Sequence, residues 1–184
     1  MGKILPFRKE LLLVGILSAD DSPDDSADEE ARDAAKSRLE QHYGPSSFAG
    51  PSIPFTYTDY YAEEMGDRLK KDFIAFDTLV DPSLLADIKL VSNRIEEELT
   101  RGGRRSVNLD PGLLSLGKLI LASTKDHAHR IPLRDGIYAE VTLVYRDKSY
   151  RPLPWTYPDF RSPEYLEILH GLRGRFKERL RAGE

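Results

Sequence analysis

Two histidines and a glutamate in the second half of the chain have the residue types and spacing of a reactive site. His127 and His129 are two positions apart in the sequence, so on a strand their side chains would point to the same face. Asp135-Gly136 predicts a two-residue hairpin turn, and pairing outward from this turn places Glu140 on that face as well. Two imidazoles and a carboxylate can ligate a divalent metal ion, and a histidine can act as a general base near neutral pH. These three residues are therefore candidate catalytic residues and candidate metal ligands. The competing interpretation is that they are ordinary polar residues on the wet face of an antiparallel sheet.

Charged and aromatic residues near this group are candidates for binding a ligand. Lys125 and Arg130 flank the histidines and can bind a phosphate or carboxylate group, or can be solvated charges at strand ends. Tyr138 falls on the same face as Glu140 in the predicted register. Asp110 precedes a proline and is predicted to be the N-cap of a helix, whose exposed N–H groups can bind an anion beside it.

Two further segments contain candidate site residues. Asp59 and Glu64 belong to an acidic and aromatic loop, where carboxylates could bind magnesium or transfer protons, although exposed loop carboxylates are common. Trp155, Tyr157 and Phe160 lie among prolines and could stack a base or a sugar, or could pack against the sheet.

A near match to a phosphate-binding loop occupies residues 112–118. Gly112, Gly117 and Lys118 fit the pattern G-x-x-x-x-G-K, but Leu119 stands where the loop needs a serine or threonine to hold magnesium. The leucines inside the segment suit a buried helix better than an exposed loop. We therefore predict helix packing here and not phosphate binding.

The composition is that of an ordinary water-soluble domain. The chain has 184 residues, of which 40% are hydrophobic and 32% charged, and it has no cysteine, which excludes disulfides and thiolate chemistry and fits the cytoplasm. A formal charge of −4 argues against non-specific nucleic-acid binding. No apolar run reaches the roughly 18 residues that cross a bilayer, so no membrane partner is expected.

The first half of the chain reads as β-α-β-β-α-β, the order of a ferredoxin-like sheet with helices on one face. A capping box at Ser26 and Glu29 starts the first helix within an acidic loop over residues 18–30. Asp81-Pro82 starts the second helix. We predict strands at residues 11–17, 55–60, 71–80 and 104–109, a connecting loop at 48–54, and helices ending at Gly44 and Gly102.

The second half extends this core. Asp110-Pro111 predicts a helix over about residues 111–123, with a strand over 119–122 as the competing prediction. Asp135-Gly136 and a second turn at 146–149 predict a three-strand meander that ends near residue 153. Ser162-Pro163 starts a last helix.

The predicted fold class is therefore α+β, in a single domain over residues 1–184. A ferredoxin-like βαββαβ core covers about residues 10–110. A helix, an antiparallel three-strand meander and a C-terminal helix extend it over about residues 111–184.

Several motifs in order along the chain resemble one family. They are VNLDPG at 107–112, LASTK at 121–125, AHR at 128–130 and PWTYPD at 154–159. Together they resemble the bacterial domain-of-unknown-function family 4416, over nearly the whole chain. The family has no established activity and no catalytic residues to carry over. Some members carry a "GTP-binding protein" label, so the resemblance implies GTP binding as one alternative.

Our leading functional hypothesis is a cytoplasmic domain that binds a small phosphorylated or carboxylated ligand and that could be an enzyme. It predicts a concave pocket that joins His129, Glu140 and Asp110. The alternative is a non-enzymatic module that binds RNA or protein through its sheet face or its arginine-rich last helix. A homodimer through an edge strand is compatible with either hypothesis.

Overall fold

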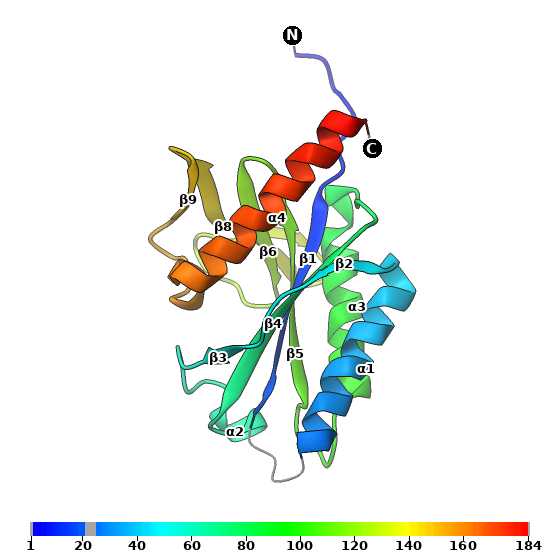
Figure 1. Cartoon of the computed structure of the whole chain (residues 1–184), viewed down its shortest axis with the longest axis vertical. Helices are drawn as coiled ribbons and strands as arrows, with labels where there is room; N and C mark the ends of the chain where they lie inside the picture. Colours follow the sequence, from blue (N-terminus) through cyan, green and yellow to red (C-terminus); the bar gives the residue numbers. More distant parts are fainter. Residues whose placement is uncertain (1, 21–24, 184) are drawn as a thin grey trace.

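The structure is a computed structural model that describes residues 2–20 and 25–183, without the side chains of residues 25–28. Helices and strands are mixed along the chain, which confirms the predicted mixed α and β composition (Figure 1). The strands are β1 (Leu11–Ala19), β2 (Ser46–Ala49), β3 (Ile53–Phe55), β4 (Leu69–Phe76), β5 (Val107–Leu114), β6 (Lys118–Ser123), β7 (Ile131–Arg134), β8 (Ile137–Arg146) and β9 (Ser149–Pro152). The helices are α1 (Asp25–Tyr43), α2 (Ala62–Met65), α3 (Leu85–Glu98) and α4 (Pro163–Ala182), with short 3-10 helices η1 (Pro82–Leu84) and η2 (Asp159–Arg161).

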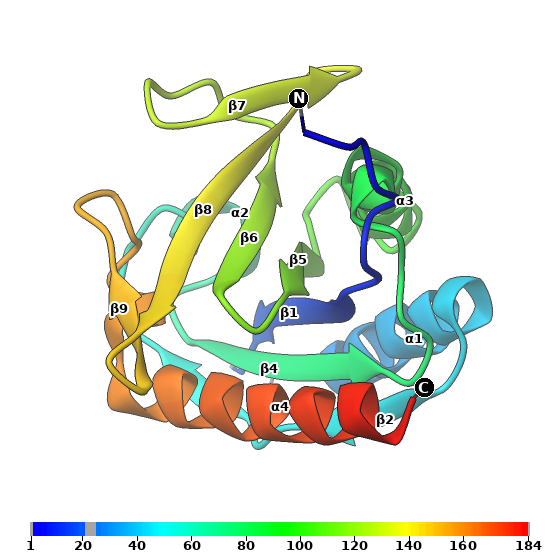
Figure 2. The same ribbon diagram turned by 90° about the horizontal axis from the view of Figure 1, so that it is seen from above.

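The described strands form one antiparallel sheet. Their order is β2-β4-β1-β5-β6-β8-β7, while β3 pairs with β4 and β9 pairs with β8 beside this path. The sheet curves strongly from β4 to β7, and α4 lies along β4 (Figure 2). The predicted meander is confirmed as β7, β8 and β9. Among the described residues, no helix has both the length and the apolar character that spanning a bilayer requires.

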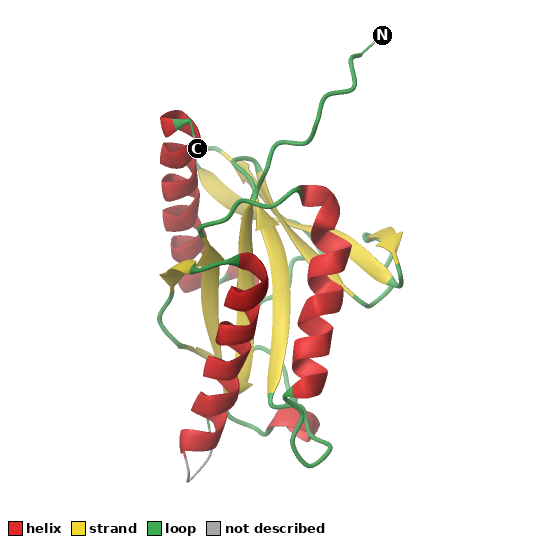
Figure 3. Ribbon diagram, turned by 90° about the vertical axis from the view of Figure 1, so that its right-hand side faces the viewer, coloured by secondary structure: helices red, strands yellow, loops and turns green. Residues whose placement is uncertain are grey.

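β1 is a central strand that is buried on both faces, as its unbroken apolar run predicts. Leu12, Val14 and Ile16 pack in one hydrophobic cluster with α1 and α3. Leu11 and Leu13 pack on the opposite face in a second cluster, with α4. Figure 3 looks onto the sheet from the side that α1 and α3 cover. Helices thus pack on both faces of the sheet at β1.

The helix starts are largely as predicted. Asp81 Oδ1 accepts a hydrogen bond from Ser83 N, and Ser162 Oγ accepts one from Tyr165 N, so both N-caps are confirmed. α1 begins inside the stretch that was predicted to be an acidic loop. The predicted capping box at Ser26 depends on a side chain that lies outside the described ones.

The predicted helix over residues 111–123 is wrong. β5 continues through the predicted helix start and β6 follows it, so the competing prediction of a strand over 119–122 is confirmed. An apolar run that is buried on both faces lacks the alternation of a half-buried strand, and periodicity alone does not separate it from a buried helix. Gly112 lies where β6 approaches closely, because a Cβ atom there would be 2.7 Å from the carbonyl oxygen of Ile120.

Several predicted boundaries in the first half are also wrong. The strand predicted at 55–60 is replaced by β3, which ends at Phe55, and by a turn that leads into α2. The strand predicted at 71–80 is β4, which begins and ends earlier, and Val80 forms only an isolated bridge. Parts of β2 and β3 occupy the predicted loop at 48–54. Short edge strands carry too few residues to show a pattern of their own.

β5 and β6 separate over much of β5, and this opening positions the candidate site. β5 pairs with β1 along its whole length, whereas its pairing with β6 is confined to residues 112–114. Pro111, the residue before this stretch, has no N–H group to donate to a neighbouring strand. Residues 107–111 therefore face an opening in the sheet.

Candidate functional site

Side chains from α3 satisfy the backbone of β5 where β6 has moved away. Leu109 N donates to Glu96 Oε1 at 2.7 Å, and the Leu109 carbonyl accepts from Lys89 Nζ at 2.7 Å. Glu96 and Lys89 are both buried, and their charged atoms lie 3.6 Å apart. These bonds take the place of a strand partner, so the opening leaves no buried backbone group of Leu109 unpaired. A pocket of about 720 Å³ lies in the opening.

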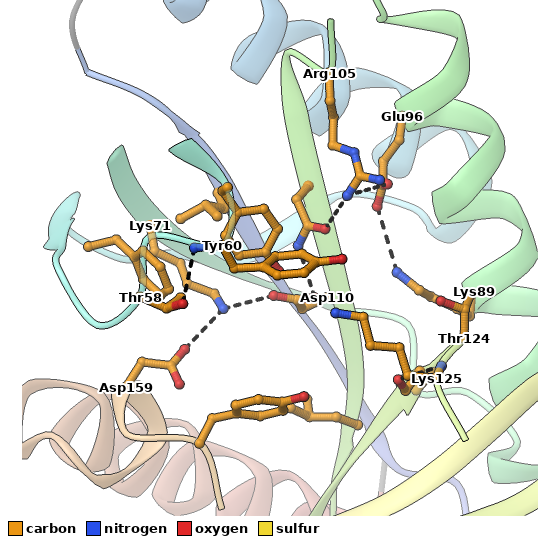
Figure 4. A pocket seen from close by; sticks show the side chains of 18 of the residues that line it. Thr58, Tyr60, Lys71, Lys89, Glu96, Arg105, Asp110, Thr124, Lys125 and Asp159 are labelled. Atoms are coloured by element: carbon orange, nitrogen blue, oxygen red, sulfur yellow. Dashed lines mark hydrogen bonds and ion pairs between the residues drawn. The ribbon is translucent and has the colours of Figure 1, made fainter. Parts of the chain in front are cut away.

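A buried lysine joins three elements on one side of this pocket. Lys71 Nζ on β4 lies 2.8 Å from Asp110 Oδ2 on β5 and 3.3 Å from Asp159 Oδ2 in η2. We call these three residues the buried triad (Figure 4). β1 lies between β4 and β5, and the lysine crosses it over Gly15, where a Cβ atom would lie 2.8 Å from Lys71 Cε. Asn108 Nδ2 donates to Asp110 Oδ1 at 3.0 Å and completes the group.

The charges of the triad are fixed by one another. Burial acts to lower the pKa of Lys71, but Asp110 and Asp159 outweigh it and hold this pKa above its usual range. Burial likewise acts to raise the pKa of Asp110, but Lys71 and Lys89 outweigh it and keep this pKa below its usual range. The ammonium also lies 5.1 Å from the centroid of the Phe160 ring, within cation–π distance. At neutral pH Lys71 is therefore protonated and Asp110 ionised.

Tyr60 and Lys125 are exposed side chains at the outer side of the pocket, which we call the mouth. They come from the loop before α2 and the loop after β6, and they point toward one another (Figure 4). Lys125 Nζ lies 3.8 Å from the centroid of the Tyr60 ring. Other aromatic side chains lining the pocket are Phe55, Tyr57, Tyr61, Tyr157 and Phe160. Burial raises the pKa of Tyr61 well above its usual range, so this phenol is neutral.

Arg130 holds the loop that carries Lys125. Arg130 Nη1 donates to Ser123 Oγ at 2.7 Å and to the Lys125 carbonyl at 2.9 Å, and Nη2 donates to Tyr157 Oη at 2.9 Å. Its Nε donates to Glu140 Oε2 at 2.8 Å, and both side chains are almost completely buried. Burial acts to lower the pKa of Arg130, but these hydrogen bonds outweigh it and raise this pKa. Arg130 thus positions the mouth, and four of its five N–H groups donate within the protein.

The predicted strand positions of the histidines are wrong. His127 and His129 lie in the loop between β6 and β7. The register of the hairpin also differs by one residue, because Ile131 lies opposite Ala139 and not opposite Glu140. An irregularity after Pro132 shifts the pairing. The sequence signal for the turn was correct, but it does not report such a shift.

His129 nevertheless meets Glu140. Its Nε2 lies 3.0 Å from Glu140 Oε2, and its ring stacks between those of Trp155 and His127, with centroids 5.2 and 5.7 Å away. The carboxylate of Glu140 is therefore shared by His129 and Arg130. In the described part of the chain, no three His, Asp or Glu side chains are grouped so that they could hold a metal ion. The predicted donor set of His127, His129 and Glu140 is not assembled.

The pocket brings some predicted residues together and leaves others out. Those that line it are Asp110, Lys125, Arg130 and Glu140. Those that do not are His127, His129, Tyr138, Asp59 and Glu64. Glu64 still reaches the site indirectly, because its Oε2 lies 3.3 Å from Nε of Arg105 in the pocket wall. The prediction that Asp110 caps a helix is wrong, since it lies within β5 and binds Lys71.

The sequence analysis missed most of the buried charges of the site. They are Lys71, Lys89, Glu96 and Asp159. A signal exists for Lys71, because alternation along β4 places it on the same face as the buried Leu69 and Phe73. No local pattern marks Asp159, which lies in a short 3-10 helix after an irregular segment.

The near match to a phosphate loop is a β-hairpin. Ser115 Oγ accepts hydrogen bonds from the N–H groups of Gly117 and Lys118, at 3.3 and 3.2 Å. β6 follows the turn in the place where a phosphate loop requires a helix. The segment is therefore neither a phosphate loop nor the helix that we predicted.

A family model described as "Domain of unknown function (DUF4416)" matches residues 24–176, so the chain belongs to this family. The resemblance seen in the sequence motifs is confirmed. No curated protein and no solved structure matches the chain.

Proposed function

We propose that this member of the family binds a small molecule carrying a phosphate or carboxylate group in the pocket between β5 and β6. Lys125 is the residue that binds the anionic group. The observation that carries the proposal is the state of its ammonium, which lies over the Tyr60 ring and forms no ion pair with any described carboxylate. A charge-assisted hydrogen bond to an anion is stronger than a cation–π contact at an exposed site, so a ligand can displace this contact.

The remaining described cations of the pocket already have carboxylate partners. Lys71 belongs to the buried triad, Lys89 lies 3.6 Å from Glu96, Arg105 lies 3.3 Å from Glu64, and Arg130 lies 2.8 Å from Glu140. The size of the pocket, about 720 Å³, is in the range that small-molecule sites occupy. Its aromatic walls offer apolar surface to the rest of the ligand.

The charges of Lys71, Asp110 and Glu140 support binding rather than proton transfer. Burial raises the pKa of Glu96, but Oε1 of this residue already accepts a hydrogen bond from Leu109 N. General acids and bases work best when their pKa lies near the working pH. The pKa of Lys71 is raised and that of Asp110 is lowered, so both are moved away from neutrality. Glu140, which we predicted to be catalytic with the histidines, is held by Arg130 and His129. The proposal therefore assigns these residues no proton-transfer role.

Binding can be tested with a panel of phosphate and carboxylate compounds, including sugar phosphates, nucleotides and dicarboxylic acids. We expect at least one compound to raise the midpoint of thermal unfolding, with its dissociation constant then measured by calorimetry. Lys125→Gln should lower the affinity for that compound by about tenfold, which corresponds to roughly 1.4 kcal/mol of binding free energy. The matched control, Lys177→Gln on the exposed side of α4, should leave affinity unchanged. Failure of every compound, or wild-type affinity in Lys125→Gln, would refute the proposal.

The alternatives have less support from the geometry. The basic last helix is partly engaged within the protein, because the guanidinium carbons of Arg173 and Arg175 lie 3.4 and 5.3 Å from the rings of Tyr145 and Phe48. GTP binding has no phosphate loop to support it, since residues 112–118 belong to a β-hairpin. The ligand panel includes GTP to test this alternative.

We further propose that the sheet contains a ferredoxin-like core. The order β2-β4-β1-β5, with α1 and α3 packed on one face, supports this assignment. We also propose a cytoplasmic location, with which a sequence without cysteine is compatible. A homodimer through the edge strand β7 is supported by its exposed Ile131 and Leu133.

A further inference from the structure

The buried triad offers more hydrogen-bond acceptors than the described residues satisfy. The side chain of Asp159 is only 7% exposed, yet its one hydrogen bond to the described residues is that from Lys71, at 3.3 Å. The two oxygens of a carboxylate together accept about four hydrogen bonds. Burying a carboxylate costs free energy unless it is paired and hydrogen-bonded. Asp159 lines the pocket, so its unused acceptor capacity is available to a bound molecule (Figure 4).

Tyr165 provides a second observation beside the triad. Its hydroxyl group is buried and has no hydrogen-bond partner among the described residues. Burial raises its pKa, against the opposing charge of Lys71, so the group is a neutral phenol within electrostatic range of the triad. Buried polar groups without a partner are rare in folded proteins. The triad and Tyr165 together form a polar region that is incompletely bonded, in which the triad lines the pocket and Tyr165 lies outside its lining.

The surplus of charge in this region has a definite sign. Two carboxylates, Asp110 and Asp159, contact the single ammonium of Lys71, and Lys89, which also acts on Asp110, is itself paired with Glu96. At the mouth the sign is reversed, because Lys125 has no carboxylate partner among the described residues. The pocket therefore has a negative buried end and a positive outer end.

We infer that the ligand is bipolar: it carries an anionic group that binds Lys125 and, at its other end, a hydroxyl or amino group that donates hydrogen bonds to Asp159 and Asp110. This inference rests on the proposed function and specifies the ligand class of the same pocket. The aromatic rings between the two ends, such as Tyr60 and Phe160, contact the apolar faces of the ligand. Phosphorylated sugars and phosphorylated amino sugars carry both an anionic group and such donors, and a simple anion does not.

Three phosphate monoesters of similar ring size separate the parts of this inference. Cyclohexylmethyl phosphate has the anion and no donor, glucose 6-phosphate adds hydroxyl groups, and glucosamine 6-phosphate adds an amino group. Calorimetry should show both sugar phosphates binding at least tenfold more tightly than cyclohexylmethyl phosphate. Tighter binding of glucosamine 6-phosphate than of glucose 6-phosphate would identify the donor as an amine, and equal binding would identify a hydroxyl.

Asp159→Asn should reduce the advantage of the sugar phosphates, because it removes the charge and one of the acceptor oxygens while Asp110 remains, and it should leave the affinity for cyclohexylmethyl phosphate unchanged. Glu167→Gln, an exposed carboxylate change on α4, is the matched control and should change none of the affinities. Equal binding of all three compounds by the wild-type protein, with weaker binding of each by Lys125→Gln, would overturn the inference and leave the proposed function standing. Absence of binding by all three compounds and by the whole ligand panel would overturn both. The wild-type comparison remains decisive if Asp159→Asn does not fold.

Discussion

Replacement of Lys71 by methionine tests whether the buried triad is a unit of the fold. Methionine has a similar length and no charge, so the substitution removes the ammonium from Asp110 and Asp159 without opening a large cavity. Breaking a buried ion pair by removing one partner costs about 3–5 kcal/mol, because a charge is left uncompensated. Lys71 is only 3% exposed and serves two carboxylates, so we expect a loss in this range. For a chain of this size the midpoint of thermal unfolding should fall by roughly 6–20 °C.

The loss should depend on pH in a direction fixed by the charges. The pKa of Asp110 is lowered in the folded protein, so its stabilising contribution is present above the unfolded value of about 3.9 and is lost as pH falls through the folded value. The difference between wild type and Lys71→Met, measured by urea unfolding, should therefore be smaller at acid pH than at pH 7. The pKa of Lys71 is raised, so its contribution is complete below about 10.4 and is lost only as pH rises through its higher folded value.

Lys70→Met is the matched control for this experiment. Lys70 is the adjacent residue on β4, and its Nζ lies 3.0 Å from Oδ1 of Asp20, whose side chain is 40% exposed. An ion pair with such an exposed partner contributes at most about 1 kcal/mol. Equal losses of stability in Lys70→Met and Lys71→Met would refute the reasoning, as would a loss in Lys71→Met that does not change with pH.

Three further substitutions test the arrangement around the pocket. Gly15→Ala should lower the free energy of unfolding by about 1–3 kcal/mol, because the new Cβ atom displaces the Lys71 side chain. This loss should be smaller when Lys71 is already replaced by methionine. Additive losses in the double variant would contradict the crossing of Lys71 over β1. Gly112→Ala should lower the free energy of unfolding by at least as much, because a Cβ atom there would meet a backbone oxygen of Ile120 as well as the side chain of Leu121. It should also speed amide hydrogen exchange in β5 and β6, and unchanged exchange would argue against close approach of the strands. Glu96→Ala should lower the free energy of unfolding by about 1–3 kcal/mol, because it leaves the Leu109 N–H group without an acceptor. Glu96→Gln keeps an acceptor oxygen and should cost less stability. Equal losses in urea unfolding would show that the hydrogen bond from Leu109 does not account for the effect.

The parts of the fold that the sequence predicts well are those set by local rules. Asp135 and Gly136 have φ angles of 53° and 74°, the left-handed values that an Asp-Gly hairpin turn requires. The cap at Asp81 and the helix that follows it depend on contacts within a few residues. Such features do not require knowledge of which distant segment will be a neighbour.

The main failure occurred where a local signal and a distant contact disagree. Asp110-Pro111 is a good helix start in isolation. Residues 107–114 instead pair along their whole length with β1, which is buried on both faces, and this pairing outweighs the local preference. A helix there would leave one long edge of β1 without a partner.

In the candidate site too, residues near a local sequence signal were predicted and residues brought together from distant segments were not. Lys125, Arg130 and Glu140 are close in sequence to a recognisable turn, and they were predicted as a group. Lys71 and Asp159 are far apart in the sequence, and they meet only because the fold brings η2 next to β4 on one side of the pocket. Buried charges assembled from distant segments leave only weak traces in a single sequence.

The opening between β5 and β6 is a built feature of the sheet and not a gap that closes when the pocket is empty. Extending the strand pair beyond Gly112 would bring β6 to Pro111, which cannot donate a hydrogen bond, and then to Leu109, whose backbone groups are already bonded to α3. Closure would have to break these bonds and bury Glu96 and Lys89 without them. The residues that keep the strands apart, Pro111, Glu96 and Lys89, differ from Lys125 and Asp159, to which we assign the ligand. Changes that alter ligand binding should therefore be separable from changes that alter the shape of the pocket.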